Sequence, residues 1–309
     1  MPKSLKYALM VFIGGFSYGA VLPLVRLSYA SGFTPGSGML AHNLLALVIL
    51  APVTLVFFRT SLNARQLLGL VAIGVVFFLT SATYFFALTY ISPSVAITLM
   101  FQYIWMGIII QAVAERKLPR LLTVASGLVV VAGTVLTTGV FNQAVSLHPL
   151  GVALSLLSAL CYALFLFFSG RVATDLPAVA RSTILTATRL ALTLALAPLL
   201  ITQMPTIPNF FIFGIPLALV GIVIPLVLIQ TAAPRLPNSV TTIMSASELP
   251  GGILLAAIFV GDSIGLVGWL GIALVLAGII LSQASELRKL WQRLKGPGSE
   301  DRGPGTDTT

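Results

Sequence analysis

The chain has 309 residues, of which 58% are apolar and only 8% are charged. A water-soluble domain carries roughly 25% charged residues, because its surface has to be hydrated. The composition therefore excludes a soluble enzyme, a secreted disulfide scaffold and a disordered regulator, and it indicates lipid as the main solvent. With a single cysteine (Cys161) and two histidines (His42 and His148), we expect no disulfide framework, no metal site and no cofactor.

Ten apolar segments follow one another along the chain, separated by Gly, Pro, Ser, Asn and charged residues. A helix needs about 20 apolar residues to cross the hydrocarbon core of a bilayer. The sequence therefore predicts an all-α polytopic membrane protein with ten transmembrane helices. The predicted helices occupy residues 7–27, 38–58, 67–88, 94–114, 121–138, 149–169, 182–204, 210–232, 238–260 and 264–283.

The basic residues are distributed unevenly over the predicted connections. Ten spans put both termini on one side of the membrane, and that side holds 15 of the 17 Lys and Arg residues. Arg26 lies on the other side and Arg189 lies inside a span. Because cytoplasmic loops carry the excess of Lys and Arg, we expect a multi-pass protein of the cytoplasmic (inner) membrane with both termini in the cytoplasm. The net charge of +9 is then explained by the orientation of the protein in the membrane, and no nucleic-acid partner is expected.

The two halves of the chain resemble each other at an offset of about 145 residues. Ala132-Gly133, for example, matches Ala277-Gly278. Each half holds five predicted helices, and since five is odd, the second copy enters the membrane in the opposite direction. The predicted parts are a first five-helix repeat at 1–142, an inverted second repeat at 143–285, and a cytoplasmic amphipathic stretch with a disordered tail at 286–309. Inverted repeats that share a site at their interface are a transporter architecture.

Several short motifs lie before the fourth predicted helix and along the last part of the second half. In the first half, residues 87–93 (ALTYISP) lead into the fourth helix, which ends at Glu115. The second half has residues 235–240 (RLPNSV), then Pro250, Gly261-Asp262, Trp269-Leu270-Gly271 and Ala277-Gly278. In these motifs the chain resembles the EamA-like family of the drug/metabolite transporter (DMT) superfamily. The resemblance implies a ten-helix secondary carrier, often an exporter of amino acids, metabolites or drugs.

The chain departs from the family pattern at two places. Trp105 stands where the family often has a proline, and His42-Asn43 stand where an arginine is common. Arg189, in contrast, resembles the arginine that the family often carries early in the seventh helix.

Ionisable groups inside the membrane cost several kcal/mol and are therefore functional candidates. Glu248 lies about ten residues into the ninth span, roughly 15 Å deep at 1.5 Å per residue. It is interpreted either as a carboxylate that takes up a proton or a cation, or as a structural partner of Arg189. Arg189 is in turn a candidate anchor for a substrate carboxylate, or a structural or gating residue. His42 and Asn43 near the outer surface suggest a pH-sensing gate or satisfied interfacial residues.

Polar and aromatic side chains near the membrane midplane are further candidates for a substrate cavity. They are Gln102, Tyr103 and Trp105 in the fourth span, Tyr84 in the third and Ser245 in the ninth. Such groups line amphipathic cavities, but they also make hydrogen bonds between helices. No catalytic constellation and no phosphate-binding GxxxxGK[ST] motif occurs in the sequence, so we expect neither an enzyme nor direct use of ATP.

The predicted function is a secondary active transporter that moves a small metabolite, amino acid or drug-like solute by alternating access. Export is the favoured direction, with coupling to protons as a hypothesis. The alternatives are an importer of the same architecture, a passive channel and an integral-membrane lipid enzyme. The expected partners are the small-molecule substrate, the lipid bilayer and protons, and the protein is a monomer or a homodimer.

Overall fold

The computed structural model describes residues 3–57, 62–137, 148–261 and 265–284, and within these every regular element is a helix. The first half contains α1 (Lys3–Gly19), α2 (Val21–Tyr29), α3 (Pro35–Phe57), α4 (Ala64–Ala87), α5 (Pro93–Met100), α6 (Tyr103–Glu115) and α7 (Leu121–Thr137). The second contains α8 (Pro149–Ser169), α9 (Ala178–Ala195), α10 (Ala197–Leu200), α11 (Ile207–Ala218), the π-helical η2 (Leu219–Val223), α12 (Ile224–Ala232), the 3-10 turn η3 (Ala233–Arg235), α13 (Asn238–Ser245), α14 (Glu248–Val260) and α15 (Leu266–Ser282). The predicted boundary at 142/143 and the predicted tail at 286–309 lie outside the described residues.

The protein is a multi-pass integral membrane protein. Among the described residues, seven helical segments are long and apolar enough to cross a bilayer, some of them made of consecutive elements such as α1 and α2. The helices α7 and α15 are shorter and also apolar. These nine correspond in chain order to nine of the ten predicted spans. The tenth prediction, 182–204, corresponds to α9, which is less apolar because it carries Arg181, Arg189 and several hydroxyl side chains. The helix also ends earlier than predicted, since Pro198 follows within three residues of Ala195.

Two predicted spans are interrupted where a proline removes a backbone N–H donor. Pro23 cannot donate to the Gly19 carbonyl, and the first span divides there into α1 and α2. Pro225 cannot donate to the Gly221 carbonyl, and the helix widens locally into the π-helical η2 between α11 and α12. The sequence predicted both of these spans as continuous helices.

The fourth and ninth spans are each interrupted for two residues, at 101–102 and at 246–247. In the ninth span the reason is Pro250, which leaves the Ala246 carbonyl without its helical partner. The helices on either side of the two interruptions coincide at one offset: α13, α14 and α15 each begin and end 145 residues after α5, α6 and α7. The offset is the one that the sequence motifs show.

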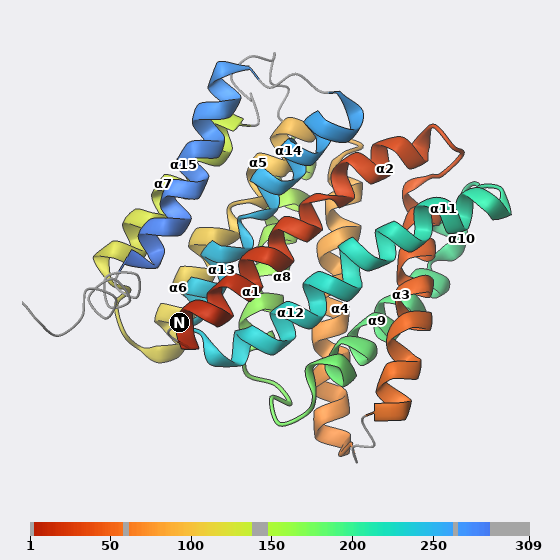
Figure 1. The fold of residues 1–309 in the computed structure, drawn as a ribbon, viewed down its shortest axis with the longest axis horizontal. Helices are drawn as coiled ribbons and strands as arrows, with labels where there is room; N and C mark the ends of the chain where they lie inside the picture. Colours follow the sequence, from red (N-terminus) through yellow and green to blue (C-terminus); the bar gives the residue numbers. More distant parts are fainter. Residues whose placement is uncertain (1–2, 58–61, 138–147, 262–264, 285–309) are drawn as a thin grey trace, which may run out of the picture.

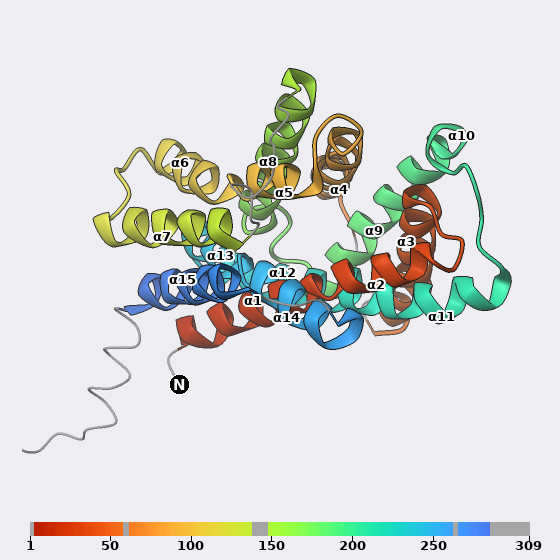
Figure 2. The same cartoon turned by 90° about the horizontal axis from the view of Figure 1, so that it is seen from above.

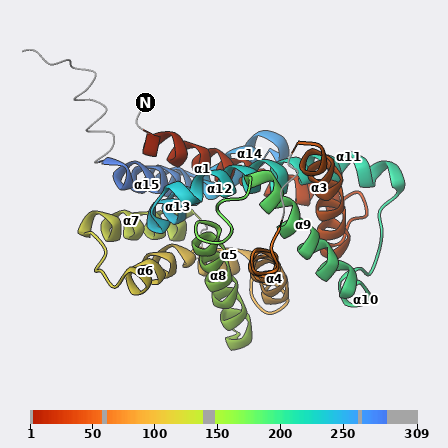
Figure 3. The same ribbon diagram turned by 90° about the horizontal axis from the view of Figure 1, so that it is seen from below.

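The helices α7 and α15 lie side by side at one end of the molecule, and α3, α9 and α11 lie at the other end (Figures 2 and 3). Glycines allow the close approach of α7 and α15. A Cβ atom at Gly133 would lie 2.8 Å from the Gly271 carbonyl oxygen, and a Cβ at Gly278 would lie 2.9 Å from the Ser126 carbonyl oxygen. These glycines therefore serve a contact within one chain.

The start of α1 and the end of α15 lie toward the lower left of Figure 1, on the side where the end of α3, the start of α4 and the α6–α7, α8–α9 and α12–α13 connections also lie. We call this side the basic face, because Arg65, Arg116, Lys117, Arg120 and Arg171 lie at its helix ends and connections. The α2–α3 and α10–α11 connections lie on the opposite side, which we call the far face.

Candidate functional site

A cavity of about 710 Å³ lies between the two halves of the bundle. Its described lining comes from the ends of α1 and α7, from α2, from the first turns of α3 and α14, from the last turns of α4, from α5 and Phe101 after it, and from α9, α11 and η2. Arg26 and Tyr29 near the end of α2 and Pro35 at the start of α3 belong to this lining. The cavity therefore extends from the middle of the bundle toward the far face.

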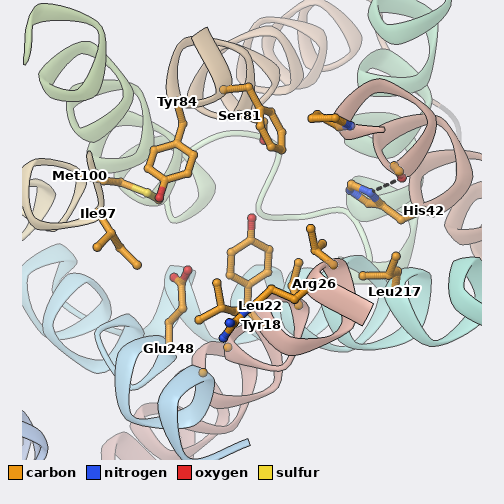
Figure 4. Close-up of a pocket in the computed structure, with 18 of the residues that line it drawn as sticks. Tyr18, Leu22, Arg26, His42, Ser81, Tyr84, Ile97, Met100, Leu217 and Glu248 are labelled. Carbon is orange, nitrogen blue, oxygen red and sulfur yellow. Dashed lines mark hydrogen bonds between the residues drawn. The ribbon is translucent and has the colours of Figure 1, made fainter. Parts of the chain in front are cut away.

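Glu248 is the carboxylate of the cavity. The interruption at 246–247 makes it the first residue of α14, where the unpaired N–H groups of a helix start favour negative charge. In Figure 4 its carboxylate points into the cavity, as do the side chains of Tyr18 and Tyr84. Its Oε2 atom is buried, and among the described residues it has no hydrogen-bond partner.

Two arginines belong to the same lining, Arg26 on α2 and Arg189 on α9, and Arg189 is only 1% exposed. The guanidinium carbon of Arg189 lies 4.1 Å from the centre of the Phe77 ring, and Nη2 donates a long hydrogen bond of 3.5 Å to Ser81 Oγ. Nε and Nη1 have no partner among the described residues. The ring attracts the cation, but it satisfies none of these donors.

Glu248 and Arg189 do not form an ion pair with each other. The described part of the chain shows one ion pair, at 3.5 Å between Arg171 and Glu115, and it is largely solvent-exposed. Of the two interpretations of Glu248, the structural partner of Arg189 is therefore not the one that this conformation shows. A buried charge without a partner carries a large desolvation cost, which a ligand, a water molecule or a proton in the cavity would reduce. The free atoms of Glu248 and Arg189 can therefore bind such a group.

The other predicted candidates on this side of the bundle are divided between lining and packing. Tyr84 and His42 line the cavity, and His42 Nδ1 lies 2.9 Å from the Gly38 carbonyl oxygen. Asn43 is fully buried outside the lining, and its amide nitrogen donates to the Met39 carbonyl oxygen at 2.7 Å. The lining thus includes one of the two adjacent polar residues in α3.

The predicted candidates of the fourth span, with Ser245, lie outside the lining. Trp105 is 42% exposed, and its Nε1 donates to Gln102 Oε1 at 2.8 Å. The Ser245 hydroxyl donates to the Thr241 carbonyl oxygen at 2.9 Å. Tyr103 is fully buried against Tyr162, with ring centres 4.7 Å apart. The structure therefore brings together Glu248, Arg189, Tyr84 and His42, and it does not bring Gln102, Tyr103, Trp105, Ser245 or Asn43 into this cavity.

Sequence reasoning missed Tyr18, whose ring rises from α1 into the cavity (Figure 4). Its position follows from two flanking glycines. A Cβ at Gly15 would lie 2.8 Å from the Ser245 carbonyl oxygen, and a Cβ at Gly19 would lie 2.9 Å from the Gly251 carbonyl carbon. Because α1 packs directly on the interruption beside Glu248, a side chain between these glycines is placed next to the site. A tyrosine between close-packing glycines was the available signal.

The bundle is closed on the basic-face side of the cavity by polar contacts, two of them between the halves and others that Arg181 makes within the second half. The amide of Asn238 donates to the Gly107 carbonyl oxygen at 2.9 Å, and the Ser239 backbone N–H donates to Gln111 Oε1 at 2.6 Å. Arg181, only 2% exposed, donates to the carbonyl oxygens of Ser169 and Gln230 near the ends of α8 and α12. An arginine satisfies such free carbonyls at helix ends well, and it fixes three helices together.

The site has no donor set suited to a metal ion. Within the described residues, no three His, Cys, Asp or Glu side chains gather closely enough to bind one. The lining offers the Glu248 carboxylate, the guanidinium groups of Arg26 and Arg189, phenol and imidazole groups and a largely apolar wall. Sites for small organic solutes have this character, since a few polar groups in an apolar pocket fix the orientation of the ligand.

Comparison with known proteins agrees with this description. Residues 149–283 match the EamA-like transporter family. A solved structure described only as a crystal structure of a protein is similar to this chain with a TM-score of 0.76 and 16% sequence identity, and the match covers 89% of this chain and 97% of that one. A search of curated proteins finds no match. The resemblance to this family that the motifs indicate is confirmed over residues 149–283.

Proposed function

We propose that the protein is a secondary carrier that moves a small organic solute across the cytoplasmic membrane by alternating access. The observation that carries the proposal is the cavity of about 710 Å³ with an unpaired glutamate and an unpaired arginine in its lining. It extends to the far face, whereas polar contacts close the basic face. A channel would need a continuous polar path between the two faces. The contacts of Asn238, Ser239 and Arg181 interrupt such a path.

The repeated helix pattern supports a movement that exchanges the two faces. The helices α5, α6 and α7 have the same lengths and spacing as α13, α14 and α15, and the interruptions fall at equivalent places. Five spans in each half make the two copies opposite in direction. A bundle of two inverted copies has two related conformations, in which the halves exchange roles. The conformation described here is then the one open to the far face.

The basic face is the cytoplasmic side in this proposal, because most of the Lys and Arg residues belong to it. The cavity then opens away from the cytoplasm, and both ends of the chain lie inside. In this orientation, an exported solute binds from the cytoplasm and leaves through the cavity described above.

Glu248 is the residue at which a proton couples to transport. A buried carboxylate is costly when charged, and protonation from the far face removes that cost. A proton taken up there would be carried to the cytoplasm as the solute leaves. Arg189 retains its charge throughout, and it orients an acidic or polar oxygen of the solute through its two free donors.

Flux into proteoliposomes tests the proposal. Purified protein is reconstituted and offered a panel of radiolabelled amino acids, organic anions and organic cations, with and without a pH gradient. The proposal predicts saturable flux of at least one class, accelerated by acid on the far-face side. Flux that rises linearly with concentration for every solute would indicate a channel, and chemical modification of the lipids without flux would indicate an enzyme.

A further inference from the structure

A series of aromatic rings in contact with one another begins at the cavity lining and runs into the buried core of the bundle. It runs from Phe101 through Tyr103, Tyr162 and Phe165 to Phe77, with successive ring centres 5.5, 4.7, 5.9 and 4.1 Å apart. We call these five rings the aromatic floor. One end, Phe101, lines the cavity, and the other end is covered by the guanidinium of Arg189, which also lines it. The rings between Phe101 and Arg189 are at most 6% exposed.

The hydroxyl group of Tyr103 is not explained by packing in this conformation. The residue is 0% exposed, and its Oη atom has no hydrogen-bond partner among the described residues. The ring alone makes the contacts with Phe101 and Tyr162, so a phenylalanine would fill the same space. A buried hydroxyl without a partner lowers stability, because it has lost its hydrogen bonds to water. A different conformation in which the hydroxyl is used would account for it.

Tyr103 and Glu248 occupy the same place in the two halves. Tyr103 is the first residue of α6 after the interruption at 101–102, and Glu248 is the first residue of α14 after the interruption at 246–247. The two positions are 145 residues apart. Glu248 faces the cavity that opens to the far face, and Tyr103 is a buried ring of the aromatic floor, outside the cavity lining. If the two halves exchange roles, Tyr103 becomes the residue that faces the opening.

We propose that Tyr103, with the ring of Tyr162 beside it, is a second binding site for the transported solute, sealed in this conformation and exposed when the carrier opens to the basic face. The proposal rests on the function proposed above. The phenol hydroxyl of Tyr103 donates a hydrogen bond to an oxygen of the solute, and the surrounding rings accept its apolar body. The solute class is therefore one that joins an oxygen acceptor to an apolar group.

Thiol labelling tests which face exposes Tyr103. Cys161 is the chain's single cysteine, so Cys161→Ser gives a background without thiols. Tyr84→Cys, in the cavity described here, and Tyr103→Cys are each introduced into this background and treated with a membrane-impermeant maleimide in intact cells and in inverted vesicles. We expect the two positions to be labelled from opposite sides of the membrane. Labelling of both from the same side, or of Tyr103→Cys from neither, would overturn the proposal.

Tyr103→Phe tests the hydroxyl without disturbing the ring. We expect its KM for solute offered at the basic face to rise about tenfold, which corresponds to one lost hydrogen bond of about 1.4 kcal/mol. The KM measured from the far face should change less than twofold, and the thermal midpoint should not fall. Tyr84→Phe is the matched control, with the larger effect expected at the far face. Equal KM values from both faces for Tyr103→Phe would contradict the proposal.

The two failures are distinguishable by the flux of the Cys161→Ser parent. A parent without saturable flux for any solute removes the carrier function, and the second site with it. A parent that transports normally while Tyr84→Cys and Tyr103→Cys react from the same side removes only the second site.

Discussion

The two interrupted helices of the bundle reach one geometry by different chemistry. Between α13 and α14 the interruption follows from Pro250, and the next helix begins with a carboxylate in the cavity. Between α5 and α6 there is no proline. Instead, the Gln102 amide donates to the Thr98 carbonyl oxygen at 3.0 Å and its oxygen accepts from Trp105 Nε1.

The comparison separates what the two halves share from what distinguishes them. They share the place of the interruption, which positions the first residue of the following helix at the middle of the bundle. They differ in the group at that position: the α14 interruption presents an acid to the open cavity, and the α6 interruption buries a phenol. In the proposed carrier, Glu248 is the ionisable coupling group and Tyr103 is its neutral counterpart, so substitutions in the two halves should have unequal effects.

The largest effect is expected for Arg189→Leu in the open cavity. Two free donors of a charged group are lost, and hydrogen bonds to charged groups contribute about 1.5–3 kcal/mol, so flux should fall roughly 10- to 100-fold. The protein should still fold, because an unpaired buried charge is replaced by an apolar side chain. The rate of solute flux into proteoliposomes checks this.

Arg171→Gln is the control for that variant, since Arg171 forms the exposed ion pair with Glu115, and surface pairs contribute little. Wild-type flux is expected for Arg171→Gln. An unchanged rate for Arg189→Leu would remove this arginine from the site.

Glu248→Gln should abolish the pH dependence of flux. The amide resembles the protonated acid in shape and cannot titrate, so the curve of flux against far-face pH becomes flat, whereas the wild type is accelerated by acid. Flux is measured from pH 5.5 to 8 with the opposite side held constant. Glu115→Gln, an exposed carboxylate at the end of α6, serves as the control and should keep the wild-type curve. A Glu248→Gln protein that still responds to pH would exclude this residue as the coupling group.

Gly19→Ala tests the close packing of α1 on the α13–α14 interruption. Its Cβ would meet backbone atoms of α14, which cannot move aside as a side chain can. We expect a loss of about 1–3 kcal/mol in the free energy of unfolding, measured by denaturant titration in detergent. Gly107→Ala meets the side chain of Thr242 and should cost less, and Gly38→Ala meets nothing within 4 Å and should cost nothing. The opposite order of these three variants would contradict the packing described here.

Asn238→Ala should have a small effect on folding and a specific effect on opening. It removes the bond to the Gly107 carbonyl oxygen, worth about 1 kcal/mol, from the closed basic-face side. Labelling of Tyr103→Cys from that side should accelerate about fivefold. Asn63→Ala also removes a hydrogen bond, at the exposed start of α4, and should leave labelling unchanged. Equal labelling rates in the two variants would show that Asn238 does not hold the bundle closed.

Much of the fold was predictable because lipid imposes long apolar runs. The positions of nine spans follow from hydropathy and are confirmed as long or shorter apolar helices. Interruptions were harder to predict. Pro23, Pro225 and Pro250 stand in the sequence where helices break or widen, but a proline in a membrane helix does not itself say which outcome follows. The interruption at 101–102 has no proline, so local composition gave no signal for it.

The site was predictable only in part, because the rotation of a helix decides which side chains face inward. Rare charges were identifiable by their cost in lipid, and Glu248 and Arg189 do lie in one cavity. Neutral polar residues carry no such signal. Trp105 and Tyr84 were both candidates for the substrate cavity from the sequence, yet Trp105 is 42% exposed outside the lining and Tyr84 lies in the lining.

Counterflow measures whether the carrier exposes bound solute to the two faces in turn. Proteoliposomes are loaded with a high concentration of unlabelled solute, diluted, and given a trace of the same solute in labelled form. A carrier that opens to one side at a time returns loaded, so labelled solute should accumulate transiently above its external concentration. Labelled solute that only equilibrates, at the same rate in loaded and empty vesicles, would contradict alternating access.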